Sequence, residues 1–103
     1  MPSKYHSRPT EMDGVVFHSQ REARRYSELK MLERSKIIRD LELQPKFLIT
    51  INGYKICTYI ADFRYRDQAD RVVVEDSKGF ATPVYKLKRK LVEAVHGVRI
   101  VEV

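Results

Sequence analysis

Two strand-like segments in the middle of the chain carry acidic residues and a lysine. The first segment, residues 58–66, contains Asp62, and the second, residues 71–79, contains Asp76 and Lys78. Residues i and i+2 of a strand lie on one face, so Asp76 and Lys78 point the same way. If the two segments pair as a hairpin, Asp62 approaches Asp76. The sequence then predicts a small acidic site beside an amine.

Two carboxylates at close range need a partner of opposite charge. At about 4 Å, two like charges repel by roughly 4 kcal/mol at an effective dielectric of about 20. Either one carboxyl group stays protonated or a cation lies between them. Mg²⁺ suits one or two carboxylates together with waters and a substrate phosphate. Metal-assisted hydrolysis of a phosphodiester is therefore one chemistry open to this set, with the lysine stabilising the hydroxide or the charge at phosphorus.

The same residues also have a purely structural interpretation. Valine-rich strands often end in charged residues, and Asp76 with Lys78 can form an ion pair worth under about 1 kcal/mol. Glu75 faces away from Asp76 if the strand is regular, and a bulge would exchange their roles. An Asp-x-Lys triplet alone is a weak signal, so the order of the surrounding elements has to decide.

Composition favours one small globular domain with a nucleic-acid partner. The 103 residues are 43% hydrophobic and 33% charged, which suits a single core. Lys and Arg outnumber Asp and Glu by 20 to 14, for a net charge of +6. This balance favours an anionic partner, with nucleic acid first and a membrane surface second. We expect no membrane span and no leader, and the single Cys57 excludes an internal disulfide, so we expect a cytoplasmic protein.

Local signals place the first elements. Residues 1–10 lack an apolar period and are expected to be a flexible basic arm, with residues 11–103 forming the domain. Asp13-Gly14 favours a tight hairpin turn. Ser19 and Glu22 have capping-box spacing and predict a helix to about residue 36. Its expected apolar positions are Ala23, Tyr26, Leu29 and Met31 or Leu32.

Three strands and a second helix are expected to follow. Residues 41–45 are interpreted as a linker ended by a proline. The strands are expected at residues 46–51, about 54–66 and 71–77, with a tight turn at Asn52-Gly53. Thr82-Pro83 predicts the start of the second helix and Gly97 its C-terminal cap.

The second helix has an apolar stripe and a basic stretch. The stripe is formed by Val84, Leu87, Leu91 and Val95 or Ala94. The basic residues are Lys86, Lys88, Arg89 and Lys90, and they suit either a solvated helix face or a phosphate-contacting surface. Residues 98–103 alternate as a last strand, and the helix before them is long enough for a parallel crossover.

This order of elements resembles the PD-(D/E)XK, or restriction-endonuclease-like, nucleases. Their fold is a single-domain α/β core of order α-β-β-β-α-β, with a mixed sheet flanked by helices. Asp62 matches the aspartate of the family's Pro-Asp half, although Ala61 replaces the frequent proline. Asp76-Ser77-Lys78 matches the (D/E)-x-K triplet, and Glu22 matches an acidic residue that many members carry in the first helix.

The sequence resembles even more closely a family of small phage-encoded proteins of unassigned function. Four segments carry this likeness, and they are Phe17–Tyr26, Leu43–Phe47, Tyr59–Phe63 and Val74–Gly79. They are spread over most of residues 11–96, so the resemblance covers nearly the whole expected domain.

The resemblance implies a divalent-metal-dependent DNA endonuclease. Asp62, Asp76 and Glu22 would hold Mg²⁺, which Mn²⁺ can replace, and Lys78 would be the catalytic lysine. For Glu22, a role as helix cap alone stays open. The basic residues Lys86, Lys88, Arg89 and Lys90 would contact DNA.

The substrate and assembly follow from the size of the chain. A small surface favours recognition of DNA shape, such as branched or junction DNA, in phage DNA recombination, repair or processing. The resemblance implies products with 5′-phosphate and 3′-hydroxyl ends. A homodimer would suit cutting of both strands.

Two other functions stay open. A non-catalytic nucleic-acid-binding module with this fold would bind DNA in a salt-dependent way and would not cut it. A protein that acts on a host protein would have a stable protein partner and would be indifferent to Asp76→Ala.

Overall fold

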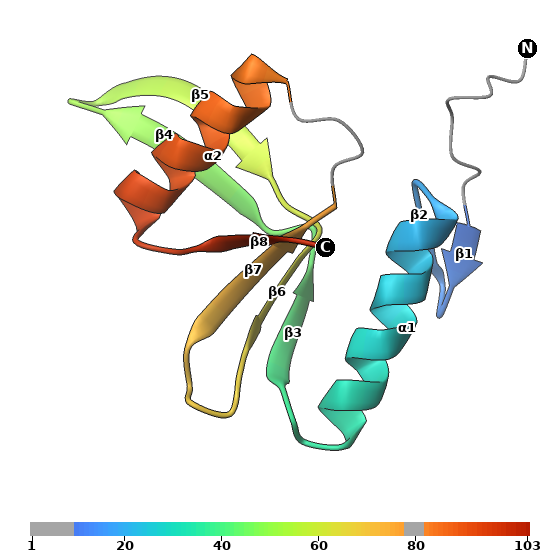
Figure 1. Ribbon diagram of the computed structural model, residues 1–103. Coiled ribbons are helices and arrows are strands. Elements are labelled where there is room, and N and C mark those ends of the chain that lie inside the picture. Colours follow the sequence, from blue (N-terminus) through green and yellow to red (C-terminus); the bar gives the residue numbers. More distant parts are fainter. Residues whose placement is uncertain (1–9, 78–81) are drawn as a thin grey trace, which may run out of the picture.

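The fold is a mixed four-stranded sheet with a helix on each side (Figure 1). The computed structural model describes residues 10–77 and 82–103. The two helices are α1 (Gln20–Arg34) and α2 (Pro83–His96). The sheet has the order β3-β6-β7-β8, and its strands are β3 (Arg39–Leu43), β6 (Phe63–Arg66), β7 (Val72–Asp76) and β8 (Ile100–Glu102). The predicted α/β class with a mixed sheet flanked by helices is confirmed.

Strand directions follow from the connections. β3 with β6 and β6 with β7 are antiparallel, whereas β7 and β8 are parallel and are joined through α2. The predicted crossover through the second helix is therefore confirmed. Most of the expected flexible arm, residues 1–9, lies outside the described residues, as do residues 78–81 with Lys78.

A second, two-stranded sheet continues two of these strands. β4 (Lys46–Ile51) and β5 (Tyr54–Ile60) pair antiparallel. β3 leads into β4, and β5 leads into β6, so the four segments form one long hairpin that bends in the middle (Figure 1). The expected strand at residues 54–66 therefore exists but is interrupted at Ala61 and Asp62.

The bend is held by backbone hydrogen bonds. The Gln44 N–H donates to the Asp62 carbonyl at 2.8 Å, and the Ala61 N–H donates to the Pro45 carbonyl at 3.1 Å. Gln44 has a left-handed φ of 51°, which turns the chain before the proline. Asp62 is thereby fixed at the joint between the two sheets.

The expected linker at residues 41–45 is wrong for most of its length. Residues 39–43 form β3, and Leu43 pairs with Phe63. Leu41 and Leu43 pack on the core beneath α1. These leucines are two residues apart, which is the period of a strand, and Pro45 marks the bend that ends the strand.

Turns and helix ends agree with their local signals. Asn52 and Gly53 have φ angles of 51° and 82°, as a type I′ turn requires. The Ser19 side chain accepts from the Glu22 N–H at 3.0 Å, and Thr82 accepts from the Tyr85 N–H at 3.0 Å. Gly97 ends α2 in the left-handed region. These expectations are confirmed.

A small ribbon precedes α1. β1 (Thr10–Met12) and β2 (Val15–Phe17) pair antiparallel around the predicted Asp-Gly turn. Phe17 is buried and contacts the rings of Tyr26 and Phe63. The ribbon therefore belongs to the hydrophobic core beneath α1, together with Ala23, Tyr26, Leu29, Ile38, Phe63 and Tyr65.

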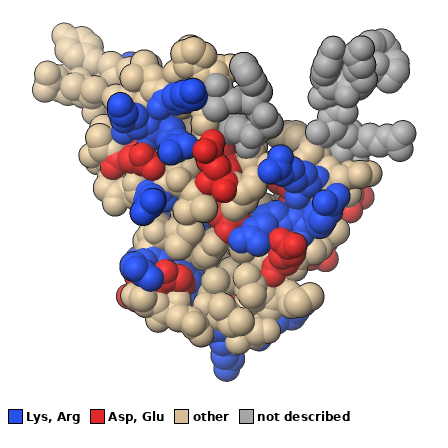
Figure 2. Space-filling view, viewed as in Figure 1, with Lys and Arg blue, Asp and Glu red and all other residues tan. Residues whose placement is uncertain are grey.

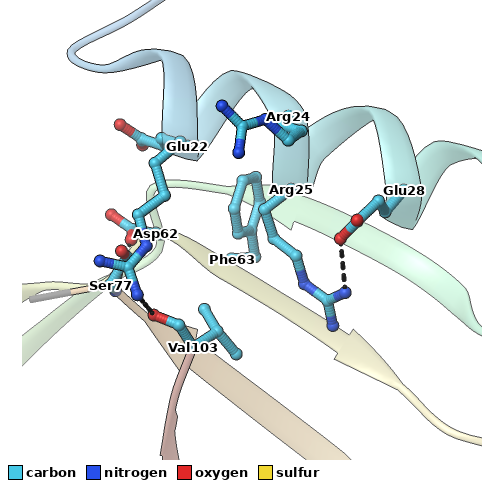
Figure 3. A pocket seen from close by; sticks show the side chains of 9 residues that line it. Glu22, Arg24, Arg25, Glu28, Asp62, Phe63, Ser77 and Val103 are labelled. Atoms are coloured by element: carbon cyan, nitrogen blue, oxygen red, sulfur yellow. Dashed lines mark hydrogen bonds and ion pairs between the residues drawn. The ribbon is translucent and has the colours of Figure 1, made fainter. Parts of the chain in front are cut away.

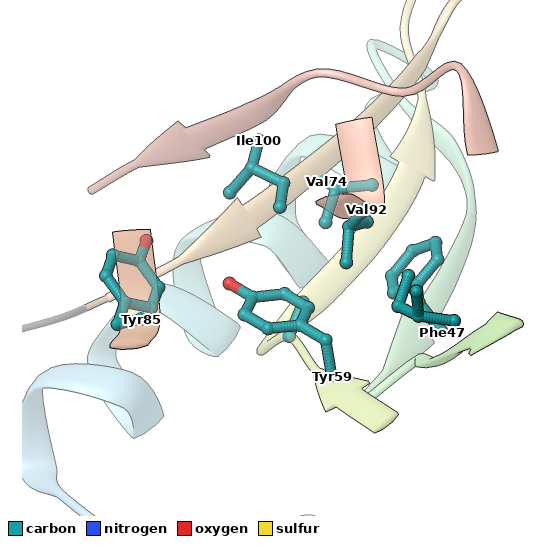
Figure 4. Close-up of a cluster of buried hydrophobic side chains, with 8 residues drawn as sticks. Phe47, Tyr59, Val74, Tyr85, Val92 and Ile100 are labelled. Atoms are coloured by element: carbon teal, nitrogen blue, oxygen red, sulfur yellow. The ribbon is translucent and has the colours of Figure 1, made fainter. Parts of the chain in front are cut away.

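A second core lies on the other face of the sheet, beneath α2 (Figure 4). It contains Phe47, Ile49, Tyr59, Ala61, Val74, Tyr85, Val92 and Ile100. The long hairpin, β7, β8 and α2 all contribute residues to this core. Because the hairpin bends, β4 and β5 cover one side of it. No helix among the described residues is long and apolar enough to cross a membrane.

The expected apolar faces of the helices need correction. In α1, Leu32 packs on the core, but Met31 is 61% exposed. In α2, Val84, Leu87 and Val95 are 63%, 59% and 45% exposed. The buried residues of α2 are instead Tyr85 and Val92, and of the predicted stripe Leu91 packs, partly buried, on the same core. The exposed and the buried residues of α2 both recur at helical spacing, so the packing of α2 on the hairpin decides which face is buried.

We expect Val92→Ala to lower the free energy of unfolding by about 2 kcal/mol, because Val92 is fully buried and its methyl groups leave a cavity. Leu87→Ala is the matched control on the exposed face and should change it by less than about 0.5 kcal/mol. Urea unfolding followed by circular dichroism measures both. A larger loss for Leu87→Ala would mean that the other face of α2 is buried.

Candidate active site

A pocket of about 310 Å³ opens between the first half of α1 and the strand ends (Figure 3). α1 contributes Arg21, Glu22, Arg24 and Arg25, and the strand ends contribute Asp62 and Ser77. The predicted site residues Glu22 and Asp62 thus line one pocket.

Asp62 is fixed in this pocket by the end of β7. Its Oδ2 accepts a hydrogen bond from the Ser77 N–H at 2.7 Å, and its own N–H donates to the Glu75 carbonyl at 3.0 Å. Ser77 precedes Lys78, which lies outside the described residues. The bend therefore brings the Asp62 carboxylate to the backbone at the end of β7, whereas the expected approach of Asp62 to the Asp76 side chain is not part of this contact.

Glu22 caps its helix and also lines the pocket. Its Oε1 accepts from the His18 N–H at 3.3 Å, and its N–H donates to Ser19 Oγ. The capping interpretation is confirmed. Because the start of α1 lies beside the strand ends, the cap holds a carboxylate that is only 7% exposed at the pocket wall. Its role toward a metal stays a prediction.

Asp76 is fully buried and faces the core beneath α2. Its Oδ2 accepts a hydrogen bond from the Tyr59 hydroxyl. Burial and this hydrogen bond raise the pKa of Tyr59 above its ordinary value. Burial also raises the pKa of Tyr85, and the negative charge of Asp76 raises this pKa further. Asp76 is thus joined to Asp62 through the backbone of Ser77, while its side chain contacts tyrosines.

Glu75 faces the opposite side, as a regular strand requires, and β6 pairs with β7 without a bulge. Its carboxylate is almost fully buried and accepts two hydrogen bonds from Arg25, at 2.8 Å and 2.6 Å, and one from the Tyr65 hydroxyl. The Glu75 bond raises the pKa of Arg25, and burial raises the pKa of Tyr65. The sequence did not predict this pair, whose members are 50 residues apart.

The carboxylates of Glu22 and Asp62 can be compared with the needs of a magnesium ion. Within residues 10–77 and 82–103, no three carboxylate, imidazole or thiol side chains are grouped so as to hold a metal ion. Mg²⁺, however, needs only one or two carboxylates beside waters and phosphate. Glu22 and Asp62 each have one oxygen held by a backbone donor, which is the usual environment of metal-binding carboxylates. Both residues line the pocket, and their role toward a metal stays a prediction.

The basic residues expected to contact DNA are part of α2. Lys86 and Lys90 are exposed, and Lys88 is half-buried. Arg89 forms an ion pair with Glu102 at 3.0 Å, so its charge is partly neutralised. Figure 2 shows Lys and Arg side chains gathered over α2 and over the first half of α1, with acidic side chains between them. The basic group over α1 was not predicted from the sequence.

The fold and the pocket define a small α/β protein with acidic and basic residues around one opening. The chain belongs to the family described as "protein of unknown function (DUF1064)", which it matches over residues 2–100. No curated protein sequence matches the chain.

We expect Arg25→Met to lower the free energy of unfolding by about 3 kcal/mol, because it leaves the buried Glu75 carboxylate without its cation. Arg34→Met, an exposed change in the same helix, is the control. Adding Glu75→Gln to Arg25→Met should recover part of the loss. Urea unfolding of the four proteins tests this, and equal stability of both single variants would contradict it.

Stability should fall as the pH rises above about 10. Unfolded tyrosines lose their protons near pH 10, whereas Tyr59 and Tyr65 have raised pKa values and keep theirs in the fold. The unfolded state then binds fewer protons, so alkali favours it. The measurement is the free energy of unfolding between about pH 9 and about pH 11. Tyr59→Phe with Tyr65→Phe should flatten the slope, and an unchanged slope would show that these phenols do not cause it.

Proposed function

We propose that this protein is a divalent-metal-dependent DNA endonuclease with a PD-(D/E)XK core. The observation that carries the proposal is the shared pocket of Glu22 and Asp62, which come from α1 and from the bend of the hairpin. Asp62 is bonded there to the backbone of Ser77, directly before Lys78. Acidic residues from distant parts of the chain therefore meet the end of β7 in one pocket.

The order of the elements supports this proposal. When each half of the bent hairpin counts as one strand, the order is α1, β3 with β4, β5 with β6, β7, α2 and β8. This is the α-β-β-β-α-β order of the nuclease core, with the parallel pair formed across the second helix. The fold alone does not carry function, so the acidic pocket is the stronger support.

Glu22 and Asp62 would hold Mg²⁺ or Mn²⁺, and Asp76, whose side chain faces the core beneath α2, would join them only if it turned toward the pocket. When bound, the ion lowers the pKa of a water and draws charge from the scissile phosphate. The protein's part is to keep both carboxylates in place before substrate arrives, through the His18 and Ser77 N–H groups. Lys78 is proposed to stabilise the attacking hydroxide.

The proposed substrate is DNA recognised by its shape, with branched or junction DNA favoured. The net charge of +6 attracts the phosphate backbone. The basic side chains over α1 and α2 lie on the face that Figure 2 shows, which suits a substrate wider than one strand. Cleavage would leave 5′-phosphate and 3′-hydroxyl ends, in phage DNA recombination, repair or processing, and a homodimer would suit cutting of both strands.

One observation favours the second candidate, a non-catalytic nucleic-acid-binding module. The Asp76 carboxylate is fully buried and hydrogen-bonded to Tyr59 on the α2 side of the sheet. A nuclease that needs Asp76 as a metal ligand would require this side chain to reach the pocket. Cleavage assays decide between the two candidates.

We expect the wild type to cut linear, nicked or four-way-junction DNA with Mg²⁺ or Mn²⁺, and Asp62→Asn and Lys78→Ala to abolish cutting. Asp40→Asn is the matched control, because Asp40 is exposed, lies in β3 away from the pocket, and asparagine tolerates its left-handed φ of 58°. Gel analysis of the products measures the rates.

Calorimetric titration with Mn²⁺ separates metal binding from cutting. Asp62→Asn and Glu22→Gln should lose the binding heat, and Asp40→Asn should keep it. Cutting that survives in both Asp62→Asn and Lys78→Ala would remove the proposed site. Absence of cutting on every substrate, with DNA binding intact, would favour the binding module.

A further inference from the structure

Three arginines on one face of α1 line the pocket. Arg21, Arg24 and Arg25 are spaced i, i+3 and i+4, so their side chains are neighbours on the helix. Like charges at this spacing destabilise a helix by a few tenths of a kcal/mol, roughly 0.2–0.5 per pair. Arg25 is compensated by Glu75 and Glu28. Arg21 and Arg24 differ from Arg25, because both are exposed.

Arg21 is oriented by the end of the last strand. One of its terminal nitrogens donates to the Val103 carbonyl at 2.8 Å, and the dashed line to Val103 in Figure 3 marks this bond. A guanidinium has five N–H donors, and this bond uses one of them. The side chain is therefore held at the pocket while most of its donors remain available to a ligand.

Arg24 lies one turn further along α1. Figure 3 shows its guanidinium on the pocket side of the helix, near Glu22. Within residues 10–77 and 82–103 its side chain makes no hydrogen bond or ion pair. Arg34, at the end of the same helix, is exposed too but does not line the pocket, so location and not exposure distinguishes Arg24.

We propose that Arg21 and Arg24 bind a backbone phosphate of a nucleic-acid strand at the mouth of this pocket. This inference rests on the proposed function and names how its substrate is held. The acidic residues Glu22 and Asp62 repel a phosphate, and the two guanidinium groups beside them offset that repulsion. Guanidinium groups match phosphate oxygens in geometry and can bind them through two parallel hydrogen bonds.

The ligand is a strand and not a small anion. Lys86 and Lys90 form a second exposed basic group on α2. Figure 2 shows basic side chains over α1 and over α2 on one face of the molecule. A nucleic-acid backbone presents phosphates at regular intervals and can reach both groups at once. The α1 arginines would hold the strand next to the phosphate at the acidic residues, and the α2 lysines would hold it further away.

The test measures DNA binding without cutting. Fluorescence anisotropy of a labelled four-way junction and a labelled duplex is recorded in EDTA at several salt concentrations. We expect Arg21→Gln with Arg24→Gln to weaken binding about tenfold or more, and to reduce the slope of log affinity against log salt by about two. Arg34→Gln removes the same charge from the same helix and should leave affinity and slope close to those of the wild type.

Arg24→Gln alone keeps the inference testable if loss of the Arg21–Val103 bond disturbs folding. It should reduce the salt slope by about one. Wild-type affinity and slope in the double variant, or equal losses in Arg34→Gln, would overturn the inference even if the protein cuts DNA. If the double variant loses binding and the wild type never cuts with Mn²⁺, the phosphate site stands and the endonuclease proposal fails.

Discussion

The bend of the long hairpin is the constraint on which the rest of the structure depends. At this point the chain leaves one sheet and enters another, and hydrogen bonds between Gln44 and Asp62 and between Ala61 and Pro45 satisfy the backbone there. Without the bend, β4 and β5 would continue the plane of β3 and β6, and Phe47, Ile49 and Tyr59 would be lost from the core beneath α2. The same bend turns Asp62 out of the strand and toward the end of β7.

Burial of two neighbouring carboxylates is the second constraint. Glu75 and Asp76 are adjacent in β7 and nearly inaccessible, and each points into a different core. A buried charge is tolerated only when donors satisfy it. Arg25 and Tyr65 donate hydrogen bonds to Glu75, and Tyr59 donates one to Asp76. The end of β7 is therefore a polar junction between two hydrophobic cores, and it ties α1 to the sheet through Arg25.

α1 brings both signs of charge to the pocket. Glu22 supplies a carboxylate through its helix cap, and Arg21 and Arg24, one residue before it and two residues after it, line the same pocket. An acidic wall suits a cation, while basic groups at the opening suit a phosphate, so the two do not compete for one ligand. The proposed ligand, a phosphodiester with a divalent ion, would carry charges opposite to these groups.

The sequence by itself determined the local features of this protein. The caps at Ser19 and Thr82, the turn at Asn52-Gly53 and the opposite faces of Glu75 and Asp76 all depend on residues a few positions apart, whose geometry is set by the backbone. The acidic residues Glu22 and Asp62 were also singled out from the sequence, and the structure places both at one pocket, while their role stays a prediction.

Tertiary structure decided what depends on contacts between distant segments. The face of α2 that is buried, the strand at residues 39–43 and the Arg25–Glu75 pair each required a partner far along the chain. Helical spacing fits both the Leu87 face and the Val92 face of α2, and only the hairpin beneath the helix selects one. The arginines of α1 are likewise unremarkable in the sequence and acquire a role because the strand ends lie opposite them.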